Sequence, residues 1–397
     1  MAVERADALV IGAGISGAAV AYHLARRGLR RVVAFEARTP AAGATGRAAG
    51  IVSEQLWDRW DVETVRESKV EYAALAARAA PGAYRQNGFV RWTSDANVAR
   101  ALRDRIAELR RWGVEVRSIE PAELSRLLPA VRTDGLEEIA YAPTDAVVAP
   151  STLAEAYVAE ARHLGVEWRL VAPVGEVRSG GGGWFWSDRG TTYTSPVVVV
   201  AAGAWSKRLL AASGFPLPLA PYRTQAAVLT VPDGVPESAP SFDDLDTDIY
   251  ARPEENGRLL AGDGTERFET DPETFVPMGD PEFVAHLAEG FAERLPGWAE
   301  ARLIRAWAGV CVATPDRRPL VGPVPGAPGL YTITGFNGFG VMRAGGAASR
   351  LVDAIVDGGE AATARLASVA PARFAGSLPS FTPHDGFTLQ AGSDPQF

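Results

Sequence analysis

Hydrophobic and polar positions change their period early in the chain. The stretch "DALVIGAG" (7–14) is a short apolar run that ends in glycines, which is typical of a buried strand. "ISGAAVAYHLARRG" (15–28) then has helical spacing, and "RRVVAFEA" (30–37) is a second apolar strand. Residues 7–37 are therefore predicted to form one βαβ unit.

The later pattern mixes helices with strands of two kinds. Helical spacing predicts helices over 61–80, 97–113, 151–165, 281–295 and 342–358. "VVVVAAGAWS" (197–206) is predicted as a buried strand that ends in small residues, and "YRQNGFVRWTS" (84–94) is predicted as a hairpin or strand pair. Residues 216–275 alternate short strands with Pro, Gly and Asp turns, which indicates an antiparallel sheet outside the βαβ region.

This order of elements predicts an α/β fold, α+β overall. We expect a Rossmann-like nucleotide-binding domain with an inserted antiparallel-sheet substrate domain. The nucleotide-binding domain is predicted to be discontinuous, over residues 1–80, 143–220 and 305–370. The substrate domain is expected over 81–142 and 221–304, and 371–397 is a Pro/Ser/Gly-rich tail with little periodicity.

Composition narrows the class of protein. The 397 residues are 47% hydrophobic and 22% charged, as in an ordinary globular protein. A net charge of −8 argues against nucleic acid as a partner. The apolar run 8–25 is interrupted by glycines and polar residues, so no membrane span is predicted. One cysteine allows no internal disulfide, which fits a cytoplasmic location. The oligomeric state stays open.

The first strand–helix junction carries the glycine motif Gly12-x-Gly14-x-x-Gly17. The first glycine permits a tight turn, the second lets the backbone approach a pyrophosphate, and the third lets the helix pack on the strand. Glu36 ends the next strand, where its carboxylate can accept hydrogen bonds from ribose hydroxyls. The motif predicts a bound adenosine dinucleotide and does not choose between NAD and FAD.

Three more stretches make that choice: "AAGATGRAAGIVS" (41–53), "VVVVAAGAWS" (197–206) and the long run from "TPDRRPLVG" to "LVDAIVDG" (314–358). Together they resemble the D-amino-acid oxidase family of FAD-dependent oxidoreductases. The resemblance implies FAD as the cofactor and an amino acid or a secondary or N-methyl amine as substrate. It implies hydride transfer from carbon to flavin, hydrolysis of the imine, and dioxygen or another redox partner as electron acceptor.

"GFNGFG" (335–340) precedes a helix, whose N–H groups and positive end can stabilise negative charge on a reduced flavin. The alternative is a simple helix cap. The motif and the resemblance together predict these cofactor-binding residues: Gly12, Gly14, Ile15, Ser16, Gly17, Glu36, Ala37, Arg38, Thr45, Gly46, Arg47, Gly50, Ile51, Val174, Ala201, Ala202, Gly203, Trp205, Gly335, Asn337, Gly338, Phe339, Gly340, Val341 and Met342.

Three residues are predicted to serve the substrate: Arg223, Tyr250 and Cys311. By resemblance, Arg223 and Tyr250 occupy positions that contact a substrate carboxylate, and an arginine fork suits a carboxylate chemically. The alternative for Arg223 is an ion pair within the protein. We expect Arg252 to be structural, on the strand face away from Tyr250.

The chain departs from the family pattern at Cys311, where relatives carry an arginine that binds the substrate carboxylate. Met342 and Val52 likewise stand where relatives have basic residues, and "GRLLAG" (257–262) lacks a lysine that promotes reaction with dioxygen. The missing lysine favours a dehydrogenase. Cys311 has three interpretations: a covalent FAD tether, a thiol lining the substrate site, or inert packing.

Two other function classes stay open. One is a non-catalytic regulatory or scaffold flavoprotein subunit of the same fold, which the missing carboxylate ligands would favour. The other is a flavin oxidoreductase that acts on a hydroxy acid. The scattered histidines match no metal-ligand spacing, so no metal is predicted.

Overall fold

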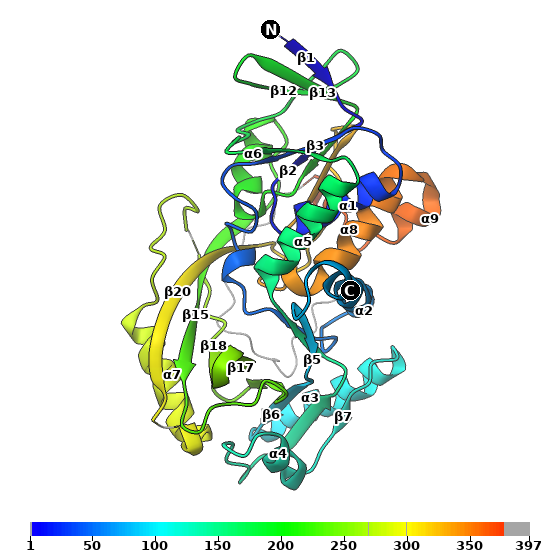
Figure 1. Cartoon of the computed structure of the whole chain (residues 1–397). Coiled ribbons are helices and arrows are strands. Elements are labelled where there is room, and N and C mark those ends of the chain that lie inside the picture. Colours follow the sequence, from blue (N-terminus) through cyan, green and yellow to red (C-terminus); the bar gives the residue numbers. More distant parts are fainter. Residues whose placement is uncertain (1, 269, 299, 377–397) are drawn as a thin grey trace.

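The computed structural model describes residues 2–268, 270–298 and 300–376. Its two large sheets lie in opposite halves of an elongated molecule, with helices packed around the first and against the second (Figure 1). The predicted α/β class, with strands and helices in several sheets, is confirmed. The predicted tail falls mostly on 377–397, which lie outside the described residues.

The first sheet is six-stranded and contains the predicted βαβ unit. Neighbouring strands are parallel, except that the edge strand runs antiparallel to its neighbour. The inner strands are short and mostly apolar, because both faces of the sheet are covered there, whereas the edge strand β10 carries Glu167 and Arg169 and is only half-buried. In spatial order the strands are β10 (Glu167–Leu170), β3 (Val32–Glu36), β2 (Ala8–Ile11), β14 (Val197–Val200), β22 (Leu330–Thr334) and β21 (Leu320–Pro323).

The second sheet is nine-stranded and mostly antiparallel, as the turn-rich region predicted. Its longest pair is β15 with β20, and only β6 and β16 pair in parallel. In spatial order the strands are β19 (Arg267–Phe268), β15 (Ala220–Thr230), β18 (Arg258–Gly262), β17 (Ile249–Glu254), β16 (Ser241–Asp244), β6 (Phe89–Thr93), β8 (Glu138–Ala142) and β7 (Arg117–Ser118), with β20 (Arg302–Ala313) on β15.

Two small sheets complete the strands. A three-stranded sheet joins β4 (Ile51–Val52), β9 (Ala146–Val148) and β5 (Tyr84–Gln86). A four-stranded sheet joins β1 (Ala2–Arg5), β13 (Thr191–Ser195), β12 (Gly183–Asp188) and β11 (Arg178–Gly180). The hairpin predicted over 84–94 is wrong: β5 pairs with β9, whereas β6 pairs with β8 and β16.

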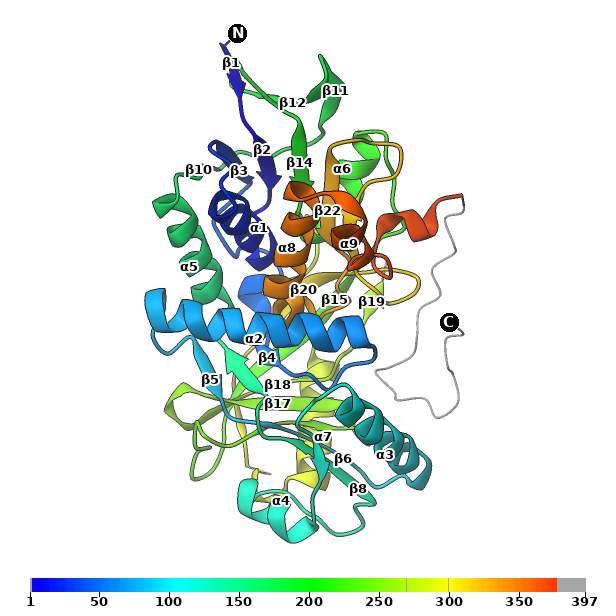
Figure 2. The same ribbon diagram turned by 90° about the vertical axis from the view of Figure 1, so that its right-hand side faces the viewer.

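Helices cover the sheets. The described helices are α1 (Ile15–Arg26), α2 (Arg59–Ala79), α3 (Ala96–Arg111), α4 (Pro121–Leu127), α5 (Pro150–His163), α6 (Ser206–Ala212), α7 (Pro281–Arg294), α8 (Gly340–Val356) and α9 (Gly359–Ala364). α1, α5 and α8 pack side by side against the parallel sheet, and α2 crosses below them toward the nine-stranded sheet (Figure 2). In the described part of the chain, no helix is long and apolar enough to cross a membrane.

Small residues on α8 bring it close to α2. A Cβ on Gly346 would lie 2.4 Å from the carbonyl oxygen of Thr64 on α2, a distance that real atoms do not tolerate. The two helices share one hydrophobic core with α1, α5 and the parallel sheet. A second core joins the nine-stranded sheet to α7 and α4. Residues 305–313 were expected in the nucleotide-binding domain. They belong to β20 and pair with β15, so the nine-stranded sheet extends toward the six-stranded one through them.

Candidate active site

Three glycine-containing loops meet at one edge of the parallel sheet. β2, β14 and β22 are adjacent and parallel, so the residues that follow them leave the sheet at the same carboxyl edge. These are the loops that begin at Gly12, Ala201 and Gly335. In open α/β sheets, ligands bind outside the carboxyl ends of the strands. The structure thus brings the three predicted cofactor loops together.

The glycine motif is required by packing as well as by a ligand. Gly12 has φ +111°, and a Cβ there would lie 2.5 Å from the carbonyl oxygen of Ala201. A Cβ on Gly17 would lie 2.1 Å from the carbonyl oxygen of Gly12. Both contacts are with backbone, which cannot rotate out of the way. The first and third glycines therefore do what the motif predicts: they make the turn and let α1 pack on β2.

The start of α1 is arranged for phosphates and a ribose. The backbone N–H of Ile15 donates to Thr45 Oγ1 at 3.1 Å, so the second predicted loop lies against the helix start. Glu36 Oε2 accepts from the Ala13 N–H and Glu36 Oε1 from the Arg38 N–H, both at 2.8 Å. A helix begins with unpaired N–H groups and a partial positive charge. The residues present fit an adenosine dinucleotide: donors for the pyrophosphate and a fixed carboxylate for the ribose.

The loop around Arg47 lies against the nine-stranded sheet. The Arg47 guanidinium donates to the carbonyl oxygens of Ala42 and Gly43, which closes the loop on itself. The backbone carbonyl oxygen of Arg47 accepts from Trp307 Nε1 at 3.1 Å. A Cβ on Gly309 would lie 3.2 Å from Arg47 Cβ. β20 therefore contacts this predicted FAD loop directly, and a side chain at Gly309 would push the Arg47 side chain aside by a few tenths of an ångström.

The "GFNGFG" loop is held by one amide side chain. Asn337 Nδ2 donates to the carbonyl oxygens of Gly335 at 2.9 Å and Arg317 at 2.6 Å. Its Oδ1 accepts from the Thr314 N–H at 3.1 Å, and its own N–H donates to the carbonyl oxygen of Val312 at 3.1 Å. α8 begins at Gly340, immediately after this loop. Asn337 therefore fixes the start of α8 relative to β20.

Cys311 lies on the inner face of the nine-stranded sheet, which we define by Trp307, Gly309, Cys311, Tyr222 and Tyr250. Tyr222 is directly opposite Cys311 in the β15–β20 pair, and the hydroxyl and the thiol are in hydrogen-bonding contact. The inner face meets the "GFNGFG" loop, because a Cβ on Gly338 would lie 3.1 Å from Tyr222 Oη. Burial raises the pKa of the Cys311 thiol to about 11 and raises that of Tyr222 as well. Both groups are neutral at physiological pH.

Arg223, predicted as a carboxylate ligand, is on the other face. Its neighbour Tyr222 faces inward, and successive side chains of a strand alternate. The Arg223 guanidinium is buried, pairs with Asp280 at 2.7 and 3.0 Å, and donates to the carbonyl oxygens of Val276 and Met278. The structure thus corrects the prediction in favour of the alternative, an internal ion pair. Tyr222 was missed, although two-residue alternation in "PYRTQ" was the available signal.

Tyr250 is on the inner face, as its predicted role requires. Its ring covers Gly262, where a Cβ would lie 2.3 Å from Tyr250 Oη. Burial, with the nearby Asp263, raises the pKa of the Tyr250 hydroxyl. Asp243 is opposite Tyr250 in the next strand and pairs with Arg91 at 2.9 Å. A buried ion pair, also missed in the sequence, therefore lies beside the tyrosine.

Arg252 shares this face, and our expectation for its direction is wrong. Residues two apart along a strand point the same way, so Arg252 and Tyr250 lie on one side. The Arg252 guanidinium is buried, donates to the Ala49 carbonyl oxygen and pairs with Glu254. It holds the loop before Gly50 against the sheet. Arg252 therefore has a structural role, as expected, but because of these contacts and not because it faces away from Tyr250.

A buried ion pair joins the start of α8 to α2. Arg343, next after Met342, is 1% exposed and pairs with Asp61 on α2 at 2.7 Å. Its guanidinium lies over the rings of Phe339 at 5.5 Å and Trp57 at 6.0 Å. Burial raises the pKa of Asp61 to about 6, against the opposing effect of Arg343. This pair fixes α8 to α2 directly behind the "GFNGFG" loop.

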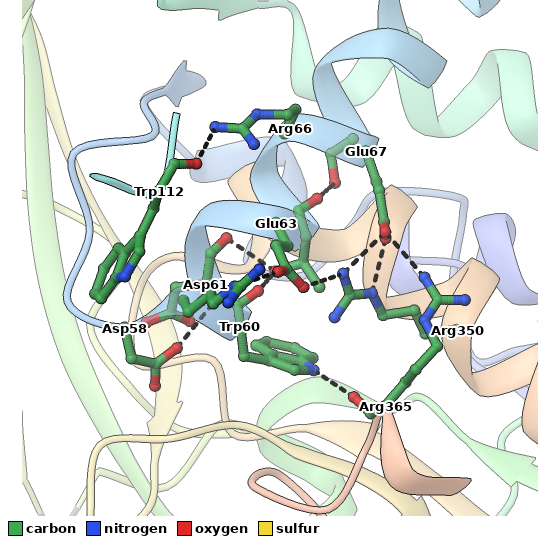
Figure 3. A network of polar contacts seen from close by, with 12 residues as sticks. Asp58, Trp60, Asp61, Glu63, Arg66, Glu67, Trp112, Arg350 and Arg365 are labelled. Carbon is green, nitrogen blue, oxygen red and sulfur yellow. Dashed lines mark hydrogen bonds and ion pairs between the residues drawn. The ribbon is translucent and has the colours of Figure 1, made fainter. Parts of the chain in front are cut away.

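More ion pairs continue along the same two helices. Figure 3 shows Arg350 of α8 facing the carboxylates of Glu67 and Glu63 of α2, with distances of 2.8 and 3.1 Å. Arg365 reaches Glu67 from beyond α8 at 2.9 Å, and its carbonyl oxygen accepts from Trp60 Nε1 at 3.0 Å. Charged contacts thus reinforce the α2–α8 packing that the glycines of α8 permit.

The remaining predicted cofactor residues surround these loops or lie beyond them. Trp205 Nε1 donates to Glu273 at 2.7 Å, and Arg38 lies over the Trp205 ring at 5.8 Å. The carbonyl oxygen of Val341 accepts from the Tyr72 hydroxyl. Val174 packs in the hydrophobic cluster on the outer side of the sheet. The other predicted cofactor residues lie in or next to the loops already described: Ser16, Ala37, Gly46, Ile51, Ala202 and Gly203. Within the described part of the chain, no cluster of residues suits a metal ion.

Comparison with known proteins assigns the class. The sequence profile of the family described as "FAD dependent oxidoreductase" matches residues 7–354. The chain belongs to this family, and its cofactor is FAD.

Its relatives include glycine oxidase of Geobacillus kaustophilus (strain HTA426), 26% identical over 85% of this chain and 90% of the relative. Mitochondrial dimethylglycine dehydrogenase of Rattus norvegicus is 26% identical over 89% of this chain. The chain spans 43% of that relative's length. The crystal structure of L-proline dehydrogenase from P. horikoshii superposes with a TM-score of 0.86, over 95% of this chain and 100% of that one, at 22% identity.

Proposed function

We propose that the protein oxidises the C–N bond of an amino acid or of a secondary or N-methyl amine, giving an imine that hydrolyses. The observation that carries this proposal is the inner face of the nine-stranded sheet, which bears Tyr222, Cys311 and Tyr250 and meets the "GFNGFG" loop through Tyr222. FAD supplies the chemistry when bound, since it accepts the hydride. The names of relatives, glycine oxidase and dimethylglycine dehydrogenase, support the same substrate class.

The side chains of the inner face suit a substrate that needs no strong base. Hydride leaves a carbon whose neighbouring nitrogen carries a lone pair, so the amine must be neutral and its surroundings must not protonate it. Raised pKa values keep Tyr222, Tyr250 and Cys311 protonated and uncharged. Each can orient an amine by hydrogen bonds. The thiol is not poised as a nucleophile, because a thiolate is the reactive form.

The arrangement behind the loop favours a negatively charged reduced cofactor. The first turn of α8 presents N–H groups and the positive end of the helix dipole to the region that "GFNGFG" encloses. The buried guanidinium of Arg343 adds a fixed positive charge at the end of the same turn, although Asp61 partly offsets it. Preorganised donors of this kind stabilise charge as it develops.

We further propose that the enzyme is a dehydrogenase. The whole sequence has two lysines, Lys69 and Lys207. Lys69 is buried in an ion pair with Glu54 at 2.9 Å, and Lys207 lies on α6, away from the inner face. No lysine therefore supplies the positive charge that favours reaction of a reduced flavin with dioxygen.

An anaerobic titration of the holoenzyme tests the proposal. Glycine, sarcosine, proline, D-amino acids and N-methyl amines would each be added while flavin absorbance is followed. At least one is expected to bleach it. Reoxidation by a dye should then be much faster than reoxidation by dioxygen. If no amine reduces the flavin and a hydroxy acid does, the enzyme acts on a C–O bond and the proposal fails. A flavin that no compound reduces would indicate a regulatory subunit.

A further inference from the structure

Two buried hydroxyl groups of α2 hold the beginning of α8. Tyr72 and Ser68 are both 0% exposed. The Tyr72 hydroxyl donates to the Val341 carbonyl oxygen at 2.7 Å and accepts from the Gly345 N–H at 3.2 Å. Ser68 Oγ accepts from the Gly346 N–H at 2.9 Å. The Tyr72 hydroxyl therefore reaches the first turn of α8, and the Ser68 hydroxyl reaches the second.

Gly345 gives the Tyr72 side chain access to the backbone of α8. A Cβ at Gly345 would lie 3.2 Å from Tyr72 Cε1, a contact tighter than nearly all real ones. The tyrosine ring thus packs beside a position that has no side chain. Burial raises the pKa of the Tyr72 hydroxyl. The hydroxyl is therefore protonated at physiological pH and has a proton to donate to the Val341 carbonyl oxygen.

The Val341 carbonyl oxygen belongs to a peptide group that two donors can reach. In an α-helix this oxygen accepts from the N–H of Gly345, and the Tyr72 hydroxyl contacts both of these groups. The Val341 carbonyl and the Met342 N–H share one planar peptide group. A donor to the carbonyl fixes that plane, and it draws electron density from the amide nitrogen, so that the Met342 N–H becomes a stronger donor.

This peptide group lies at the end of α8 that follows the "GFNGFG" loop. α8 begins at Gly340, so the N–H groups of Gly340, Val341 and Met342 have no partner within the helix. They carry the positive end of the helix dipole. Asn337 holds the preceding loop from the β20 side, through Thr314. Tyr72 holds the first turn from the opposite side, through α2.

We propose that Tyr72 is a positioning residue for FAD: its hydroxyl orients the Val341–Met342 peptide group so that the start of α8 stabilises the negative charge of the reduced flavin, which raises the reduction potential of the cofactor. This inference rests on the proposed function, in which the reduced flavin carries negative charge beside the first turn of α8. Tyr72 acts through the α8 backbone, so a residue of α2 joins the groups that tune the cofactor.

The size of the effect follows from the helix dipole. In a partly buried place, the positive end of a helix favours a nearby negative charge by up to roughly thirtyfold in an equilibrium constant. Tyr72 supports one of three peptide N–H groups there, so its hydroxyl should account for part of this, about three- to tenfold. For a two-electron couple, a tenfold change in the equilibrium constant is about 30 mV.

The reduction potential of the holoenzyme gives the first test. Wild type and Tyr72→Phe would be reduced slowly and anaerobically at pH 7 together with a reference dye, while the absorbances of flavin and dye are followed. Tyr72→Phe removes the hydroxyl and keeps the ring. It should lower the equilibrium constant for flavin reduction about three- to tenfold. A Tyr72→Phe enzyme with the wild-type potential would overturn the inference.

Tyr157→Phe is the matched control, because it removes the same group from the same neighbourhood. Tyr157 of α5 is 0% exposed, and its hydroxyl would lie 3.2 Å from a Cβ at Gly345. In the described part of the chain, that hydroxyl makes no hydrogen bond to the α8 backbone and faces the Glu71 carboxylate. Its loss should leave the potential within twofold of wild type in the equilibrium constant. Equal shifts in the two variants would show a general effect of packing and overturn the inference.

A second variant strengthens the donor at the same position. Fluorine makes a phenol more acidic at almost unchanged size, so 3-fluorotyrosine, introduced at position 72 through a reassigned stop codon, donates more strongly to Val341. The potential should then rise above that of wild type, a direction that damaged packing does not produce. A potential at or below wild type would overturn the inference, even where Tyr72→Phe does not retain FAD. Dye and chemical reductant replace the substrate in these measurements. A flavin that no amine reduces would therefore contradict the proposed C–N oxidation and not the role of Tyr72.

Discussion

The dinucleotide loops and the inner face of the nine-stranded sheet are built on opposite principles. The first region depends on close backbone contacts. Gly12 approaches the Ala201 backbone and Gly17 approaches the Gly12 backbone so closely that neither glycine has room for a side chain. At the second, side chains from β15, β17 and β20 share one face of the sheet, and the Tyr222 hydroxyl faces the Cys311 thiol across the β15–β20 pair. The first region is specified by a few neighbouring positions and the second by pairings of distant strands.

The difference decides what each region can tolerate. Any side chain at Gly17 would lie 2.1 Å from a backbone oxygen and would force the turn before α1 to shift. The inner face carries neutral hydroxyl and thiol groups, which can be exchanged for others of similar size with small effects on folding. Four measurements, from the largest expected effect to the smallest, sharpen this contrast.

Gly17→Ala is expected to abolish FAD binding. Gly17 has an ordinary helical backbone, so the variant adds a methyl group only, and that group would lie 2.1 Å from the Gly12 carbonyl oxygen. The turn before α1 must then move away from the phosphates. Flavin absorbance per mole of purified protein should fall to near zero, or the protein should be insoluble. Gly175→Ala, whose Cβ meets nothing within 4 Å, is the matched control. Equal flavin content in the two variants would contradict the packing argument.

Arg343→Met should cost about 3–5 kcal/mol in the free energy of unfolding. The change leaves the Asp61 carboxylate buried without its partner at 2.7 Å. Urea unfolding of the holoenzyme measures the loss. Arg365→Met is the control, because its pairs with Glu67 and Asp353 are exposed and should contribute about 0–1 kcal/mol. If the two variants are equally stable, the buried pair does not hold α8.

Asp61 also predicts a pH dependence. Burial raises its folded pKa from 3.8 to about 6, so its contribution to stability is complete below about pH 4 and is lost as pH rises to 6. The size is roughly 3 kcal/mol, at 1.36 kcal/mol per pKa unit. Unfolding free energies of wild type and Asp61→Asn, compared at pH 4 and pH 7, should differ by a changing amount that favours wild type at pH 4. A difference that is constant over this range would show that Asp61 titrates normally.

Cys311 should react slowly and matter little for folding. A thiol pKa of about 11 instead of 9.0 lowers the thiolate fraction at pH 7 by roughly a hundredfold. Iodoacetamide, followed by mass spectrometry, should modify the holoenzyme about a hundredfold more slowly than free cysteine, with rates that rise steeply above pH 10. Cys311→Ser should fold and bind FAD like wild type. Acid precipitation that leaves yellow colour on the protein would instead reveal a covalent tether.

The two regions also differ in how far the sequence predicts them. The glycine motif and Glu36 belong to one βαβ unit and Thr45 follows it closely, so local spacing places them together. Family resemblance extended this to the loop at Gly335. The direction of Arg223 depends on strand phase: alternation in "PYRTQ" shows that Tyr222 and Arg223 face opposite sides, but it does not show which side is inward. Its neighbour Tyr222 takes the inward position that chemistry alone suggested for the arginine.

The sequence also did not predict which strands pair with each other. The pattern over 84–94 correctly indicated two strands, but a short loop with Gly88 normally predicts that they pair with each other. Here Gly88 has φ +81° and donates to the Asp145 carbonyl oxygen, so the chain passes from one sheet to another. The partner strands lie elsewhere in the sequence, and alternation carries no information about them. The Arg91–Asp243 pair was invisible for the same reason.

The single amide of Asn337 couples the two regions mechanically. Its hydrogen bonds reach the chain at Gly335, at Thr314 and at Arg317, so three segments that are distant in the sequence share one anchor. Loss of this one side chain would release the loop before α8, the segment after β20 and the turn at Arg317 together.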